Sequence, residues 1–334
     1  MSLTQALDGF QRRHPAAGFP LAVFYKYFDD QGAYLAALMA YYGFLSLFPL
    51  LLLLTTALGI LLRNDVELQQ QVLQSAARQI PVLGNELVAN PRSLPGGKGL
   101  VIGVVGALYG GIGVAQAAQN AMNVIWGVPR NSRPNPFKVR GRSLLLLVTV
   151  GVGLIATTVL SELGRKAVQG VGVPGLQVLV SLGAVAANVA LFVFAFRLAT
   201  ARRLSRDDVL PGAVGAAVAL QLLQLVGGSY VKRVINGGSA TGSVFAAVLG
   251  LLAYLFLVGV IIVLCAEVNV VRALHLYPRA LLTPFTDAVD LTPGDERAYA
   301  RAAKAQRNKG FEKVDVSFDK GRTRGDEARD TSQD

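Results

Sequence analysis

The sequence contains very few of the residues that soluble enzymes use for chemistry. Its 334 residues include one cysteine, Cys265, and two histidines, His14 and His275. A single cysteine allows no internal disulfide. Two histidines cannot assemble a multi-histidine metal site, and the sequence has no phosphate loop, no CxxC pair and no nucleophile elbow. The sequence therefore predicts a protein that is not an enzyme and that needs no metal and no cofactor.

Charged residues are also scarce, at 16% of the chain, whereas 52% of the residues are hydrophobic. Six long stretches contain no charged residue at all. Each is long enough to cross a hydrocarbon core of about 30 Å as a helix that rises about 1.5 Å per residue. These stretches are residues 31–62, 99–129, 143–161, 167–196, 209–231 and 234–266. The pattern predicts an all-α, polytopic integral membrane protein with six transmembrane helices.

The basic residues between these stretches alternate in number along the chain. The gaps at 162–166 and 232–233 hold two each, whereas two other gaps are strongly basic. Positive residues are retained on the cytoplasmic side, so both termini are predicted to be cytoplasmic, with three loops outside. The strongly basic gaps contain Arg130, Arg133, Lys138, Arg140 and Arg142, and then Arg197, Arg202, Arg203 and Arg206.

The net charge of +11 follows from these loops. Basic loops next to a membrane face anionic lipid headgroups, so the positive charge does not require a nucleic-acid partner. The predicted partners are therefore the lipid bilayer and its anionic headgroups, with no nucleic acid. The sequence leaves a homo-oligomer open and assigns no substrate.

Composition divides the chain into three parts. Residues 1–30 mix basic and aromatic side chains and predict a cytoplasmic N-terminus with an interfacial helix. Residues 31–273 form the six-helix membrane domain. Its longest outer loop, about 63–98, has apolar residues at helical spacing, which predicts an amphipathic helix that either covers the bundle or packs on loop residues. Residues 286–334 intermix acidic and basic residues and predict a disordered, charged cytoplasmic tail.

The second stretch carries small residues at alternating spacings of four and three. This spacing places them on one helix face, where a partner helix can approach closely. Small residues such as Gly212 in the fifth stretch and Gly250 in the sixth make these two helices the expected partners. The face, called the glycine face below, comprises Gly99, Gly103, Gly106, Gly110, Gly113 and Ala117.

Amide side chains inside the apolar stretches form a candidate polar pathway. An unpaired polar group in hydrocarbon costs roughly a few kcal/mol, so these amides are expected to gather inside the bundle. Two interpretations stay open. The amides either join helices, at about 0.6 to 2 kcal/mol each, or line a solvated substrate path. They are Gln116, Asn120 and Asn123 in the second stretch, Asn188 in the fourth, and Gln221 and Gln224 in the fifth.

One acidic residue, Glu267, stands at the cytoplasmic edge of the sixth stretch. A buried carboxylate at this place is expected to pair with a cation such as Arg197 or Arg272, or to bind a proton as in proton-coupled transporters. The alternative is an interfacial carboxylate without a role in transport.

Three segments resemble the YihY/BrkB family of bacterial inner-membrane proteins. They are residues 36–51 (AALMAYYGFLSLFPLL), 118–126 (AQNAMNVIW) and 266–269 (AEVN), although Cys265 replaces the glycine more usual before the last. The resemblance covers residues 20–280 and leaves the tail outside. The motif residues are Tyr42, Ser46, Pro49, Asn120, Asn123, Trp126 and Glu267.

The resemblance implies a multi-pass protein of the bacterial cytoplasmic (inner) membrane. A transporter-like or lipid-handling role in the cell envelope is the first expectation, and a non-transporting membrane scaffold is the alternative. Many members carry an older ribonuclease BN label, which the scarcity of histidine disfavours here, so a membrane-bound nuclease ranks third. The family supplies no catalytic residues to carry over, so its motif residues are candidates for function or for helix packing alike.

Overall fold

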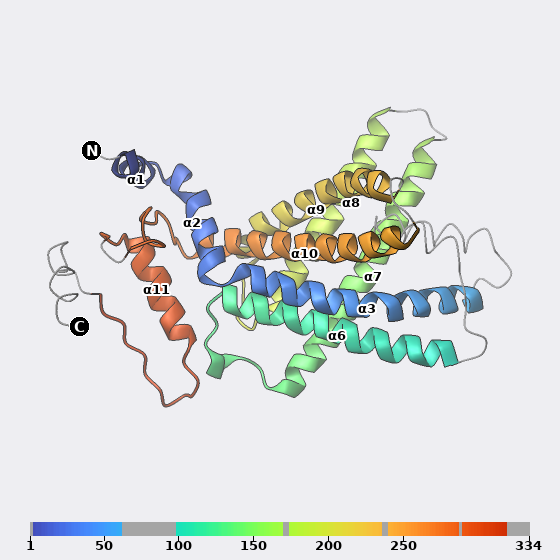
Figure 1. The fold of residues 1–334 in the computed structure, drawn as a ribbon, viewed down its shortest axis with the longest axis horizontal. Coiled ribbons are helices and arrows are strands. Elements are labelled where there is room, and N and C mark those ends of the chain that lie inside the picture. Colours follow the sequence, from blue (N-terminus) through green and yellow to red (C-terminus); the bar gives the residue numbers. More distant parts are fainter. Residues whose placement is uncertain (1–2, 62–97, 170–173, 236–239, 287–288, 319–334) are drawn as a thin grey trace.

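The computed structural model describes residues 3–61, 98–169, 174–235, 240–286 and 289–318, and within these ranges every regular element is a helix (Figure 1). The all-α prediction is confirmed. Six long helices of 26 to 34 residues correspond to the six uncharged stretches. They are α3 (Gly32–Leu61), α6 (Lys98–Ile125), α7 (Pro136–Gln169), α8 (Pro174–Ala199), α9 (Arg206–Ile235) and α10 (Ala240–Ala273).

Two helical segments of the described chain are long and apolar enough to cross a membrane. They are Leu182–Ala199 in α8 and Val248–Ala273 in α10, and little of either segment is buried inside the protein. The core helix of a soluble protein would be covered by its neighbours, so the exposed apolar side chains of these segments fit a lipid environment. The larger number of six spans stays a prediction.

The long helices pack side by side around α10 and α3. Helix α3 lies along α6 and α10, and α9 lies between α10 and α8, while α7 packs on α8 and α6 (Figure 1). Glycines set the closest approaches. A Cβ atom at Gly259 of α10 would lie 2.8 Å from the carbonyl oxygen of Ala36, and one at Gly212 of α9 would lie 2.0 Å from that of Cys265. Only a residue without a side chain lets these backbones approach so closely.

The shorter helices gather at one end of the bundle (Figure 1). These are α1 (Leu3–Arg13), α2 (Pro15–Asp29) and α11 (Pro293–Ala305), with a short 3₁₀ turn at Arg130–Ser132. Three helices that end here, α2, α6 and α10, are followed by a residue with a positive φ. Gln31 (φ 55°) turns the chain from α2 into α3, Gly127 (φ 58°) follows α6, and His275 (φ 51°) follows α10.

The two helix ends after α6 and α10 have the same hydrogen-bond pattern. Gly127 N–H donates to the Val124 carbonyl and Val128 N–H to the Asn123 carbonyl, which is a Schellman motif. His275 and Leu276 repeat it after α10 with bonds to the carbonyls of Arg272 and Val271. These turns satisfy the last helical carbonyls and direct both chains across the same end of the bundle.

The predicted disorder of residues 286–334 is wrong for the part that the structure describes. Thr292 caps α11 in a capping box with Asp295, and the Asp295 carboxylate is fully buried against Arg279. A cap and a buried ion pair order this segment without an apolar run, which is why its composition alone suggested disorder. Residues 319–334 lie outside the described residues, as does the amphipathic helix expected within 63–98 apart from Lys98, which begins α6.

Candidate functional site

The corner between α2 and α3 places an ion pair inside the protein. Lys26 and Asp30 stand four residues apart at the end of α2 and form a salt bridge, and both side chains are only 11% exposed. The Lys26 ammonium also donates to the carbonyl of Ile125, at the end of α6, over 3.3 Å. The positive φ of Gln31 directly after this pair turns α3 away and keeps the pair inside the corner.

The second carboxylate at Lys26 belongs to Glu267 of α10. Its Oε2 lies 3.7 Å from Lys26 Nζ, and the side chain is fully buried. Neither carboxylate oxygen has a hydrogen-bond partner among the described residues. The partners predicted from the sequence were wrong. Arg272 donates to the Asp207 carbonyl in the first turn of α9, and Arg197 donates to the Leu204 carbonyl in the loop before α9.

The pKa values of Lys26 and Asp30, which lie before the first long helix, are both shifted in this corner. Burial lowers the pKa of Lys26, but the carboxylates of Glu267 and Asp30 oppose it more strongly, so the pKa is raised overall. Burial also raises the pKa of Asp30, and the attraction of Lys26 offsets this only in part. The corner therefore holds Lys26 firmly protonated and carries one more acid than base.

An open cleft of about 790 Å³ adjoins this corner. Its walls are the corner itself, the end of α6 with the loop that follows, the end of α10, and α11. Trp126, the single tryptophan of the chain, also lines it. The charged lining residues are Lys26, Asp29, Asp30, Arg130, Arg133 and Arg301.

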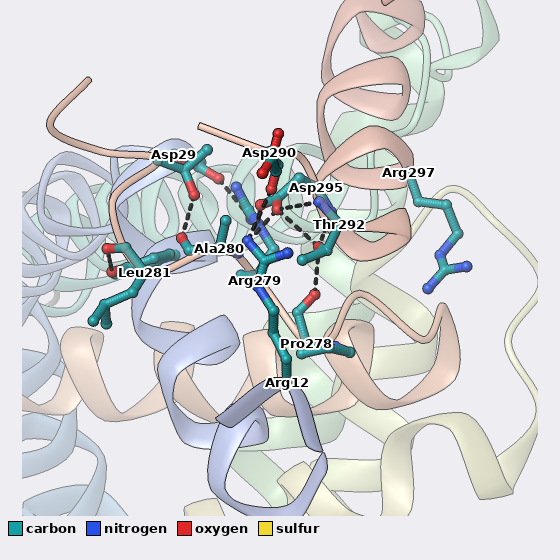
Figure 2. A network of polar contacts seen from close by, with 12 residues as sticks. Arg12, Asp29, Pro278, Arg279, Ala280, Leu281, Asp290, Thr292, Asp295 and Arg297 are labelled. Atoms are coloured by element: carbon teal, nitrogen blue, oxygen red, sulfur yellow. Dashed lines mark hydrogen bonds and ion pairs between the residues drawn. The ribbon is translucent and has the colours of Figure 1, made fainter. Parts of the chain in front are cut away.

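A buried arginine fixes the position of α11, one wall of the cleft (Figure 2). Arg279 is 1% exposed and pairs with Asp295 of α11 and, over 3.1 Å, with Asp29 of α2. Asp295 also accepts the N–H of Ala280 over 2.9 Å. Burial lowers the pKa of Arg279, but Asp29 and Asp295 oppose it and raise the pKa overall. One guanidinium thus ties the C-terminal helix to the helix that precedes the first span.

The predicted amides divide into two groups. Asn123 accepts the N–H of Ala201 over 2.8 Å and so joins α6 to the loop after α8, and Asn120 accepts from Arg133 over 3.2 Å at the cleft. Other amides of the spans join helices in the same way, with Gln119 bonded to Ser143 over 2.8 Å. The remaining predicted amides make no side-chain hydrogen bond within the described part of the chain, and they are Gln116, Asn188, Gln221 and Gln224.

The first-span motif interlocks with the glycine face. A Cβ at Gly106 would lie 2.7 Å from Pro49, one at Gly110 2.6 Å from Ser46, and one at Gly113 2.2 Å from the ring of Tyr42. The tight partner of this face is therefore α3, and the expectation that α9 and α10 would fill that role was wrong. The packing explains the spacing of both patterns, because each motif residue meets a glycine. Gly103 is buried on the same face. The burial of Gly99 is not among the described features.

Sequence reasoning missed Lys26, Asp29, Arg279 and Asp295, although two local signals were present. Lys26 and Asp30 have the spacing of a helical ion pair, and Thr292-Pro-Gly-Asp295 has the spacing of a capping box. Neither signal predicts that Lys26 and Asp30 are buried, or that α11 packs against the end of the long-helix bundle. Among the described residues, no group of three histidine, cysteine, aspartate or glutamate side chains is placed to hold a metal ion.

Comparison with known families gives a match over most of this arrangement. The model of the family described as "Virulence factor BrkB" matches residues 23–284, from α2 to the segment after Arg279. The chain belongs to the BrkB family. This membership, with the two apolar segments in α8 and α10, makes it a membrane protein, as the sequence motifs predicted.

One relative is the "Putative ribonuclease-like protein YfkH" of Bacillus subtilis (strain 168). It is 26% identical over 256 residues, which cover 74% of this chain and 92% of the relative. No solved structure matches the chain. Of the family motif, Glu267, Asn120 and Trp126 lie at or beside the cleft, and Tyr42, Ser46 and Pro49 lie in the α3–α6 packing.

Proposed function

We propose that this BrkB-family protein is a six-span protein of the bacterial cytoplasmic membrane that handles a lipid or another small substrate in the manner of a transporter. The cleft beside the Lys26–Glu267 pair is the proposed substrate site. Both termini and the cleft are proposed to face the cytoplasm, in line with the basic loops at this end. The proposed role involves no covalent chemistry.

The six-span arrangement is supported by helix length and by exposed apolar faces. The shortest of the six long helices has 26 residues, enough for about 39 Å at 1.5 Å per residue. Helix α9, which is less apolar than α8 and α10, also exposes apolar side chains at a spacing of four residues: Leu210, Val214, Val218, Leu222 and Val226. Such a row suits contact with lipid.

The observation that carries a substrate-handling role is the cleft itself. It opens between four segments of the chain, and its wall contains charges of both signs. Directly behind it, Glu267 is buried with an ammonium at 3.7 Å and no hydrogen bond to either oxygen among the described residues. Ionisable groups kept at such a cost inside a membrane protein mark substrate or ion pathways more often than packing sites.

A non-transporting scaffold is the second candidate, and the amides favour it. Gln119 and Asn269 each bond to a neighbouring helix, and Asn123 bonds to the loop after α8, which is the behaviour expected of residues that only hold the bundle together. A scaffold would need neither the cleft nor the buried Glu267. The two candidates therefore differ in whether the cleft matters.

Flux measurements in reconstituted vesicles separate these candidates. Labelled phospholipids and small ions would be followed in vesicles with and without the full-length protein. We expect flux above the protein-free level, and we expect Ala302→Trp to reduce it, because Ala302 is exposed and lines the cleft. Ala16→Trp, at an exposed position of α2 away from the cleft, is the matched control. If the flux of every tested phospholipid and ion equals that of protein-free vesicles, the scaffold would be the remaining candidate.

A further inference from the structure

The charges in the cleft are not balanced by the residues that the structure describes. Its two acids are already held, Asp29 by Arg279 and Asp30 by Lys26. Its three arginines, Arg130, Arg133 and Arg301, form no ion pair with any carboxylate of the described chain. The cleft therefore presents three guanidinium groups whose counter-charge is absent from its own walls.

The backbone segments that carry these arginines contact each other, and the Arg133 side chain is also held by hydrogen bonds. Arg133 donates from Nε to the Val128 carbonyl over 3.3 Å and from Nη1 to Asn120 over 3.2 Å. Arg301 lies on α11, whose backbone passes 4.0 Å from the Cβ position of Gly127, and Asn131 N–H donates to the Arg307 carbonyl beyond that helix. The loop after α6 and α11 thus carry their arginines as one connected surface.

The arginines also lie in a setting that raises the cost of their charge. Burial and the neighbouring Arg130 lower the pKa of Arg133, and burial and Arg202 lower the pKa of Arg301. The guanidinium groups stay protonated all the same, because their intrinsic pKa is far above neutral pH. Each of these two partly buried guanidinium groups lies near another positive charge, and an anion bound beside it relieves both the repulsion and the lost hydration.

We propose that the cleft binds a phosphate group, carried by a phospholipid headgroup or by a soluble phosphorylated compound, through Arg130, Arg133 and Arg301. Guanidinium groups bind phosphate oxygens by paired hydrogen bonds, and a phosphate offers more charge and more acceptor oxygens than a carboxylate. This inference deepens the proposed function, because it rests on the same cleft and names its ligand chemistry.

The shape of the site leaves room for more than the phosphate. Its volume of about 790 Å³ is several times that of a phosphate ion, which suits a larger headgroup. One exposed aromatic ring lines it, that of Tyr34 at 75% exposure. An exposed tyrosine at such a position is typical of a membrane interface, so a lipid headgroup is one source that the experiment must separate from a soluble one.

Trp126 gives a direct readout, because it is the single tryptophan and lines the cleft. The full-length protein in a non-ionic detergent would be titrated with dioctanoyl phosphatidic acid and dioctanoyl glycerol, and separately with glycerol 3-phosphate and glycerol. We expect a change in Trp126 fluorescence that saturates as a phosphate-bearing titrant is added. We expect no saturable change with its phosphate-free counterpart. Saturation by phosphatidic acid alone identifies a lipid headgroup, and equal affinity for glycerol 3-phosphate identifies a soluble source.

Paired charge variants test whether the arginines form the site. Arg130→Gln with Arg301→Gln should weaken binding by about tenfold or more, since each loses charged hydrogen bonds to the phosphate. Arg140→Gln with Arg203→Gln removes the same charge from exposed positions outside the cleft and should change the affinity by less than about twofold. Arg301→Lys keeps the charge but not the paired hydrogen bonds. It should weaken phosphate binding by an amount between those of the two double variants and leave the melting temperature unaltered.

Equal losses in both double variants would overturn the proposal, because general electrostatic attraction would then suffice. Saturation by dioctanoyl glycerol, or no saturation by any phosphate-bearing titrant, would overturn it as well. Binding that passes these tests in a protein without flux would leave the phosphate site standing and remove the transport role. Flux without phosphate binding would do the reverse.

Discussion

Lys26 on α2 and Glu267 on α10 form an ion pair, with 3.7 Å between Nζ and Oε2. The pair joins the helix before the first long helix to the end of the last one, at the back of the cleft. Lys26 holds a second acid, Asp30, whereas Glu267 has no other cation within ion-pair distance in the described chain. The two partners therefore depend on each other unequally.

This inequality predicts an asymmetric mutant cycle. Lys26→Met should lower the free energy of unfolding by about 3 to 5 kcal/mol, because it leaves two buried acids without a cation. Glu267→Gln should cost less, since Lys26 keeps Asp30. The double variant should lose less than the sum of the single variants, as measured by denaturant unfolding in detergent. Additive losses would mean that the two side chains are not coupled.

Asp30 predicts a dependence of stability on pH. Its pKa is raised above the ordinary 3.8 by burial, so the folded protein holds this proton to a higher pH than the unfolded chain does. Stability from this group is therefore complete below about pH 3.8 and is lost as the pH rises through the folded pKa. Asp30→Asn should match the wild-type melting temperature at about pH 3.5 and exceed it at about pH 7.

A control for this comparison is Asp290→Asn, which removes an exposed carboxylate at the same end of the protein. It reports the general effect of one fewer negative charge. A wild-type protein that melts above Asp30→Asn at neutral pH would show that the attraction of Lys26 outweighs the burial of Asp30.

The α3–α6 contact predicts opposite effects for two glycine substitutions. Gly110→Ala should destabilise the protein by about 1 to 3 kcal/mol, because the new methyl group would lie 2.6 Å from the backbone of Ser46. Gly151→Ala, in α7, meets nothing within 4 Å and should stabilise its helix by about 0.5 to 1 kcal/mol. Melting temperatures in detergent check both, and an unchanged Gly110→Ala protein would contradict the close packing.

The anchor of α11 predicts a local opening. Asp295→Asn removes the charge that pairs with buried Arg279 and should cost about 3 kcal/mol, with faster hydrogen exchange across Pro293–Ala305. Lys304→Gln removes a charge from an exposed position of the same helix and should leave the exchange unchanged. Equal protection in both variants would show that α11 is held by other contacts.

The charge alternation predicts the topology. Reporter fusions after Arg133 and Arg203 should give cytoplasmic signals, and a fusion after Gln169, at the end of α7, should give an outside signal. The reason is that the loops with many arginines resist translocation. A fusion after Arg133 that reports an outside location would contradict the six-span arrangement.

Local patterns predicted the residues of the α3–α6 contact and a few residues of the candidate site, and the rest could not be predicted from them. The glycine face and Tyr42, Ser46 and Pro49 were each visible as spacings, yet only the fold showed that these two patterns meet each other. Glu267 was singled out because a lone acid at the end of an apolar stretch is unusual. Its partner could not be read in the same way, because Lys26 lies in a distant segment that reaches it only when Gln31 turns the chain.

The sequence by itself determined the helical class, the six apolar stretches and the basic loops. These are properties of short segments, because helix length, hydropathy and charge act on each stretch before any other packs on it. The tertiary structure decided which polar groups are buried together. The ends of α2, α6 and α10 meet α11 at one place. Only their meeting turns scattered charges into an ion pair behind a cleft whose three arginines form no ion pair among the described residues. Burial makes these charges costly, so the fold, and not the composition, sets their energies.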